Sequence, residues 1–116
     1  MDIKIIQKKL QKFSKERDWD KFHTPKNLSM ALSVEVAELV EIFQWLENED
    51  SKVNKLNDMT KKSIEEELGD IMIYVIRLAD KLNIGLENSV NNKIKINSKK
   101  YPVELSKGNA VKYNKR

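Results

Sequence analysis

Acidic side chains recur at helical spacing in two apolar stretches of this chain. In SVEVAELVEIFQWLE, Glu35 and Glu38 stand three residues apart, and in SIEEELGDIMIYVIRLADKL, Glu67 and Asp70 have the same spacing. Residues three apart are neighbours on a helix surface, so each pair presents two carboxylates side by side. Two antiparallel helices could therefore bring all four carboxylates around one small space.

The position of Glu35 within its helix demands an explanation. On a helical wheel of about 100° per residue, Glu35 falls in the middle of an apolar arc, whereas Glu38 lies at its margin and Glu41 further round. The arc consists of Leu28, Ala31, Leu32, Leu39, Ile42, Phe43 and Leu46. Because an unpaired buried carboxylate is strongly unfavourable, Glu35 should have a compensating partner.

A divalent cation is the partner that this chemistry favours. Clustered carboxylates repel one another unless a cation compensates them, and a set of oxygen ligands suits Mg²⁺ or Mn²⁺. Mg²⁺ commonly shares its remaining positions with phosphate oxygens, which points to a phosphate-bearing substrate. Acids at this spacing are also common on solvated or salt-bridged helix surfaces. A register in which Glu41, Glu65 or Glu66 replaces a neighbour stays open.

Helices must position these carboxylates. Apolar residues at spacings of three and four predict helices over residues 2–17, 28–47, 61–83 and 86–98. We expect Asn27 to cap the second helix and Gly85 to end the third. Gly and Pro are scarce, at 3 and 2 residues, and no alternating β-pattern competes, so the fold class is all-α.

Composition and charge limit the remaining possibilities. The chain has 116 residues and no cysteine, which excludes disulfides and thiolate metal sites. Without a signal peptide or a long apolar run, we expect a soluble cytoplasmic protein with no membrane contact. We expect one domain over residues 1–100 and a basic tail over 101–116. The basic residues of the stretch 93–116 are either a solvated end or contacts for phosphate, from a nucleotide or a nucleic acid.

The third helix is apolar nearly all round. Its main stripe consists of Ile64, Leu68, Ile71, Val75, Leu78 and Leu82. Met72, Ile73 and Ile76 lie outside that stripe. A helix that is apolar on all sides is buried, and in so small a bundle we expect a subunit interface to cover it. This predicts a homodimer or homotetramer.

The ordered motifs resemble a known family. Glu35-x-x-Glu38 followed by Glu67-x-x-Asp70 resembles the MazG-like superfamily of all-α nucleoside triphosphate pyrophosphatases. The segments ERDWDKFHTPKNL, FQWLE, EELGDIMIYVIRLAD and KIKINSKKYP extend the similarity towards the dCTP pyrophosphatase branch. Leu10 departs from that branch, since animal members have a histidine there. This departure weakens a claim of cytosine specificity.

The resemblance implies a fold, an activity and a set of roles. It implies an oligomeric, four-helix-bundle-like MazG-type fold that hydrolyses (deoxy)nucleoside triphosphates to the monophosphate and pyrophosphate with Mg²⁺. The four carboxylates would be the metal ligands. The residues implied to line the nucleoside pocket are Trp19, Phe22, His23, Trp45 and Tyr74. Lys93 and Asn97 would face the phosphates or the sugar.

Alternatives remain for the site and for the whole chain. We expect Glu38 to accept a proton from the attacking water because it lies at the open margin of the arc, but any of the four carboxylates could do so. Without the resemblance, Trp19 and Trp45 are better explained as core packing. The chain could also be a non-enzymatic helical interaction module. A nucleic-acid-binding protein using the basic tail is disfavoured, because the body is acidic and no recognition motif is present.

Overall fold

The computed structural model describes residues 1–110, and these contain helices and turns but no strand. The all-α prediction is therefore confirmed. The long helices are α1 (Ile3–Glu16), α2 (Pro25–Phe43), α3 (Asp58–Lys81) and α4 (Leu86–Lys100). The short helices are η1 (Asp20–Phe22), η2 (Glu49–Ser51) and α5 (Val103–Ser106). No helix in the described part of the chain is long and apolar enough to cross a membrane.

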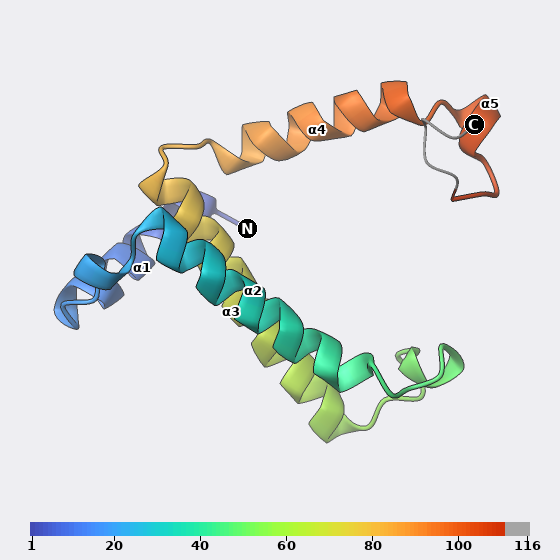
Figure 1. Cartoon of the computed structure of the whole chain (residues 1–116), viewed down its shortest axis with the longest axis horizontal. Coiled ribbons are helices and arrows are strands. Elements are labelled where there is room, and N and C mark those ends of the chain that lie inside the picture. Colours follow the sequence, from blue (N-terminus) through green and yellow to red (C-terminus); the bar gives the residue numbers. More distant parts are fainter. Residues whose placement is uncertain (111–116) are drawn as a thin grey trace. The chain divides into compact units, whose positions relative to one another are not determined.

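Helices α2 and α3 lie side by side and form the main helix pair (Figure 1). The predicted apolar arc of α2 is confirmed at Leu28, which is 1% exposed, and its other members are partly buried except Leu46. On α3, Ile76 is 2% exposed. The prediction that Ile76 belongs to a subunit interface was therefore wrong, because this chain already buries it.

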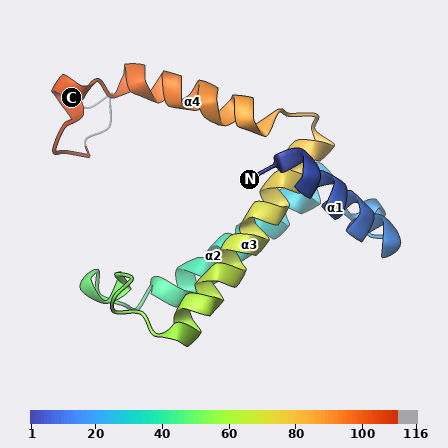
Figure 2. The ribbon, with the colours of Figure 1, turned by 180° about the vertical axis from the view of Figure 1, so that it is seen from behind.

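Helix α1 packs against α3 (Figure 2). The amide Nε2 of Gln11 donates a hydrogen bond to Oδ2 of Asp80 at 2.8 Å, and this ties α1 to the C-terminal part of α3. Ser14, on the same helix, is only 2% exposed. The backbone N–H of Ile5 donates to Oδ1 of Asp2, which caps the start of α1. These contacts place α1 and the turn after it beside the C-terminal half of α3.

The boundaries of α2 differ from the prediction at both ends. Thr24, rather than Asn27, caps the helix, since the backbone N–H of Asn27 donates to the Thr24 hydroxyl oxygen. Pro25 follows at the first helical position, where its missing N–H costs nothing. The Asn27 side chain instead donates to the carbonyl of Phe22 and holds the preceding turn. At the other end, α2 stops at Phe43 instead of reaching residue 47.

The boundaries of α3 also required correction. The helix begins at Asp58, with Asn57 as its cap, three residues before the predicted start. At its end, Asn83 rather than Gly85 has the left-handed conformation, with φ of 54°. Asparagine tolerates that region better than most residues because its short side chain can hydrogen-bond locally. Gly85 has an ordinary φ of −75° and precedes the first residue of α4.

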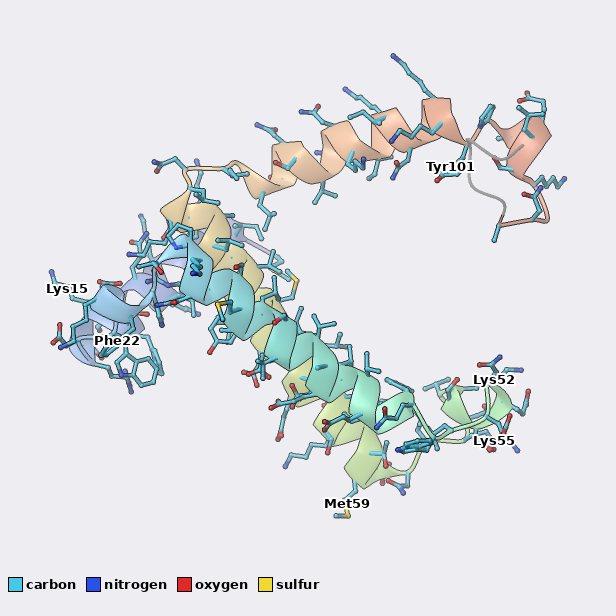
Figure 3. The ribbon with its side chains drawn as sticks, in the orientation of Figure 1. Lys15, Phe22, Lys52, Lys55, Met59 and Tyr101 are labelled. Atoms are coloured by element: carbon cyan, nitrogen blue, oxygen red, sulfur yellow. The ribbon has the colours of Figure 1, made fainter. Side chains whose placement is uncertain are left out.

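The chain divides into two compact units, Met1–Asn83 and Ile84–Arg116, which are described separately. Within the first unit, Lys15 and Phe22 lie at one end, and Lys52, Lys55 and Met59 lie at the other (Figure 3). The second unit contains α4 and α5. The predicted four-helix-bundle-like arrangement and the predicted division at residue 100 stay predictions, and part of the predicted tail lies outside the described residues.

Candidate active site

The pairing of α2 with α3 brings three of the four predicted metal ligands together. Glu35 and Glu38 come from α2 and Glu67 from α3. Each offers one carboxylate oxygen, and the three oxygens all lie within 4.8 Å of one another. We call these three residues the carboxylate cluster. Such an arrangement concentrates negative charge at the middle of the helix pair.

The carboxylate cluster brings like charges together in a partly buried place. Glu35 and Glu67 are partly buried, and Oε2 of each is buried without a hydrogen-bond partner. Burial, hydrogen bonding to Glu67 and Glu38 and the charges of Glu38 and Asp70 together raise the pKa of Glu35 to about 7. Hydrogen bonding to Glu35 lowers the pKa of Glu67, but burial and Glu38 outweigh it, so this pKa is also raised.

These residues fit a divalent cation. Among the ion pairs of residues 1–110, no Lys or Arg side chain neutralises the carboxylate cluster. The donors are hard oxygen atoms, two of them buried and unpartnered, which is the ligand chemistry that Mg²⁺ and Mn²⁺ prefer. A bound cation would relieve the repulsion that raises the pKa of Glu35.

Asp70, the fourth predicted ligand, lies beside the cluster rather than within it. Its side chain is exposed and is not among the three closely grouped carboxylates. Its charge nevertheless raises the pKa values of Glu35 and of Tyr74. Asp70 also lines a neighbouring cavity. It therefore connects the carboxylate cluster with that cavity.

The cavity has a volume of about 290 Å³ and lies between α1, the following turn and α3. Its lining residues are Leu10, Phe13, Ser14, Trp19, His23, Asp70, Ile73, Tyr74 and Arg77. The Phe13 and Trp19 rings meet edge to face with centroids 5.7 Å apart, and the Trp19 and His23 centroids are 6.3 Å apart. Flat aromatic walls of this kind suit a planar ring such as a nucleobase.

The turn after α1 sets the position of Trp19. Asp18 has a φ of 54°, a left-handed conformation in which Asp is enriched among non-glycine residues. The backbone N–H of Trp19 then donates to the carbonyl of Ser14 at 2.9 Å, and that of Phe22 donates to the carbonyl of Trp19 at 2.8 Å. These bonds fold the turn back and direct it to the cavity.

Arg77 stands at the cavity wall within a group of charged residues. Its Nη2 donates to Oδ1 of Asp20 at 2.8 Å and lies 3.2 Å from Nδ1 of His23, while Lys81 Nζ lies 3.6 Å from the same Asp20 oxygen. Burial alone would raise the pKa of Asp20, but Arg77 and Lys81 lower it overall. Burial and the charge of Arg77 lower the pKa of His23.

Comparison with known proteins shows which family this chain resembles. Residues 30–115 match the MazG-like family. The chain belongs to this family. It is 43% identical over 101 residues to dCTP pyrophosphatase 1 of Bos taurus, an alignment that covers 87% of this chain and 60% of that protein. The Homo sapiens protein of the same name is 38% identical over the same length, and the alignment covers 59% of it.

The MazG-like chain thus spans about 60% of the length of the curated relatives it matches. A solved structure, a pyrophosphatase from Archaeoglobus fulgidus, resembles it with a TM-score of 0.73 and 43% sequence identity. That match covers 80% of this chain and 85% of the archaeal chain. The family resemblance predicted from the motifs is therefore confirmed, together with an all-helical MazG-like fold.

Three of the predicted nucleoside contacts meet at the cavity. Trp19, His23 and Tyr74 line it together with Asp70. Phe22 is 58% exposed and Trp45 is 87% exposed, and neither is among the lining residues. Their roles in substrate binding stay predictions.

The predicted phosphate or sugar contacts belong to the other unit. Lys93 and Asn97 are exposed residues of α4, within Ile84–Arg116. Both lie in the segment that matches the family. Their roles stay predictions as well.

Sequence reasoning missed Arg77 and its partner Asp20. The signal for Arg77 was available, because a charged residue interrupts the apolar run YVIRLAD, just as Glu35 interrupts the apolar arc of α2. Asp20 carried no such signal, since it lies 57 residues away in a polar turn. Phe13, Ser14 and Ile73 were also not predicted at the cavity.

Proposed function

We propose that this MazG-like chain is a nucleoside triphosphate pyrophosphohydrolase that depends on Mg²⁺, with Mn²⁺ as a possible substitute. The substrate would be a (deoxy)nucleoside triphosphate, in a dCTP-type reaction or in the removal of unwanted nucleotides. The observation that carries this proposal is the position of Asp70, which links the carboxylate cluster with an aromatic cavity. The names of the relatives, dCTP pyrophosphatase 1 and pyrophosphatase, support it.

Different residues would bind the phosphates and the nucleoside of the substrate. Glu35, Glu38, Glu67 and Asp70 would hold the metal, which when bound would supply charge neutralisation for phosphate oxygens and a lowered pKa for a water. The aromatic walls of the cavity would hold the nucleoside. Because Asp70 borders both regions, the α-phosphate, which joins the nucleoside to the outer phosphates, would lie near it.

The reaction needs a group that accepts a proton. The oxygen of a water attacks the α-phosphorus, the bond from that phosphorus to the bridging oxygen breaks, and pyrophosphate leaves with the bond's electron pair. Glu38 is the exposed carboxylate of the cluster and can exchange its proton with solvent, so we assign it the proton of the attacking water. Glu35 is less suited to this role because it is partly buried.

The proposal includes an assembly and further contacts. We expect a homodimer or homotetramer, because Leu68, Met72 and Ile73 of α3 are 50%, 36% and 38% exposed and together offer an apolar surface. Lys93 and Asn97 would contact the phosphates or the sugar. A cytoplasmic location stays part of the proposal.

The test is to incubate the chain with a panel of ribonucleoside and deoxynucleoside triphosphates and Mg²⁺, and to identify the products by chromatography. We expect monophosphate and pyrophosphate in equal amounts. Diphosphate with orthophosphate would mean attack at the γ-phosphate and would contradict the proposal. A chain that hydrolyses none of the nucleotides would instead favour a non-enzymatic interaction module.

A further inference from the structure

Arg77 is a buried charge that the proposed reaction does not use. Its side chain is 3% exposed, and its Nε has no hydrogen-bond partner although it is buried. Burying a guanidinium group with an unsatisfied N–H is costly. The contacts that Arg77 does make lead to the cavity, through Asp20 and His23.

The contact with His23 fixes which ring nitrogen carries the proton. A guanidinium group has donors only, and the two hydrogens of Nη2 match two acceptors, Asp20 Oδ1 at 2.8 Å and His23 Nδ1 at 3.2 Å. Nδ1 can accept only if it is unprotonated. In a neutral imidazole the proton then resides on Nε2, which becomes a hydrogen-bond donor.

The charged surroundings favour the neutral ring. Burial and the positive charges of Arg77 and Lys81 lower the pKa of His23, and Asp20 opposes them without reversing the shift. A His23 ring protonated at Nδ1 would also point its N–H at the Arg77 guanidinium. At neutral pH the Arg77 contact and the surrounding charges therefore both favour a neutral His23 ring with its proton on Nε2.

We propose that Arg77 is a positioning residue that holds His23 in the Nε2–H tautomer, so that the cavity offers a hydrogen-bond donor to a carbonyl oxygen of the nucleobase. This inference rests on the proposed function for the identity of the occupant. His23 and Arg77 both line the cavity, whose other walls are mostly apolar. In such surroundings a donor without an acceptor is unfavourable, so the site discriminates against bases that lack the carbonyl oxygen.

The tautomer can be observed directly, because His23 is the one histidine among the 116 residues. Protein labelled with ¹⁵N-histidine gives a single imidazole in long-range ¹H–¹⁵N spectra at neutral pH. We expect an unprotonated Nδ1 and a protonated Nε2. A protonated Nδ1 in the wild-type protein would overturn the proposal, whatever the variants do.

Two variants separate positioning from general structure. Arg77→Met removes the donor, so the two ring nitrogens should move towards averaged chemical shifts as the tautomers exchange. Lys81→Met removes a cation that contacts Asp20 without contacting His23, and should leave the ring shifts close to those of the wild type. If folded Arg77→Met kept the wild-type tautomer, Arg77 would not be its cause. If Arg77→Met fails to fold, the tautomer seen in the wild-type spectrum decides whether the proposal stands.

The second measurement concerns the base. Pyrimidine deoxynucleoside triphosphates in which each carbonyl oxygen in turn is replaced by sulfur, a weaker acceptor, are compared by kcat/KM. For one position we expect a loss of roughly 2- to 13-fold in the wild type, the range of a single hydrogen bond. The loss should shrink in Arg77→Met, because only part of the neutral His23 then carries the proton on Nε2, whereas an effect of the larger size of sulfur would be unchanged. Equal kcat/KM for all analogues in the wild type would overturn the proposal.

The two measurements also distinguish this inference from the proposed function. If no nucleotide is hydrolysed, the proposed function fails, and the spectrum still tests the state of His23. If nucleotides are hydrolysed to the monophosphate but the sulfur substitutions have no effect, the function stands and the role of the His23 donor is wrong.

Discussion

Helix α3 contributes to two ionic sites, and they are built in opposite ways. Glu67 faces Glu35 and Glu38, so like charges meet, and two buried oxygens lack partners. Arg77, further along the same helix, meets acids. Its Nη2 lies 2.8 Å from Asp20 Oδ1, and its Nη1 lies 3.8 Å from Asp80 Oδ2.

The difference separates a site whose charges need a ligand from one whose charge the chain compensates with opposite charges, although Nε of Arg77 also lacks a hydrogen-bond partner. A buried charge with an opposite charge beside it is largely compensated within the fold, so it can position neighbours such as His23. A group of partly buried carboxylates without a cation is not compensated and favours binding one. Burial of charge alone does not distinguish the two sites, because both contain buried ionic groups. The sign of the surrounding charges distinguishes them.

The largest effect should come from changing the uncompensated site. Glu35→Gln keeps the shape of the side chain but removes its charge. We expect turnover to fall by about 100-fold or more, because changes to groups that merely support metal ligands already cost about 10- to 100-fold. At neutral pH the metal-free variant should melt at a higher temperature than the wild type, since repulsion is relieved. Steady-state kinetics and calorimetry measure the two effects.

Glu41→Gln is the matched control, because Glu41 is an exposed acid on the same helix outside the carboxylate cluster. It should change neither turnover nor stability appreciably. Wild-type activity in Glu35→Gln would mean that Glu35 is not a metal ligand. The carboxylate cluster would then no longer differ from the Arg77 site in needing a cation for function.

A smaller effect is expected at the cavity wall. Stacking of a base on an aromatic ring is worth about 1–3 kcal/mol, so Trp19→Ala should raise KM by roughly 5- to 150-fold with less change in kcat. Loss of binding that is equal in the ground and transition states has this kinetic signature. An unchanged KM would reduce Trp19 to a packing partner of Phe13. Trp45→Ala tests whether Trp45 lines the nucleoside pocket, as the family resemblance implies. An unchanged KM in this variant would contradict that role.

The smallest effect is a dependence of stability on pH. Because the pKa of Glu35 is raised from 4.5 to about 7, the folded state favours the protonated carboxyl. This contribution to metal-free stability is complete below pH 4.5 and is lost as the pH rises through about 7. Melting temperatures across this range should fall less steeply for Glu35→Gln than for the wild type. Equal slopes would show that burial and the neighbouring carboxylates do not raise the pKa of Glu35 in the folded state.

The helices and the carboxylate cluster could be predicted because their signals are local. The period of apolar residues predicts the arc of α2, and Glu35 stands out against that arc. On α3 the predicted stripe is only partly correct, because Leu68 and Leu82 are 50% and 48% exposed whereas Ile76, outside the stripe, is buried. The caps were harder, since Thr24 and Asn27 are both good cap residues and the choice depends on the turn that Asn27 holds. Pro25 was an unused clue, because proline favours the first helical position.

The cavity and the Arg77 site could not be derived in the same way. Arg77 pairs with Asp20 across 57 residues, and only the docking of α1 and its turn on α3 brings them together. The conformation of Asp18, with φ of 54°, directs that turn, and no periodic pattern encodes it. Trp19 and His23 were connected to a pocket by the family resemblance, not by their spacing.

Direct titration of Mg²⁺ and Mn²⁺ into metal-free protein tests the central claim most directly. Isothermal calorimetry should detect binding to the wild-type chain and to Arg77→Met, because Arg77 pairs with Asp20 and Asp80 and with no carboxylate of the cluster. Glu35→Gln should bind at least about 10-fold more weakly, by analogy with the loss on changing groups that support metal ligands. If the wild type binds neither ion with or without a nucleotide, or if Glu35→Gln binds them equally well, the carboxylate cluster is not a cation site and the account is contradicted.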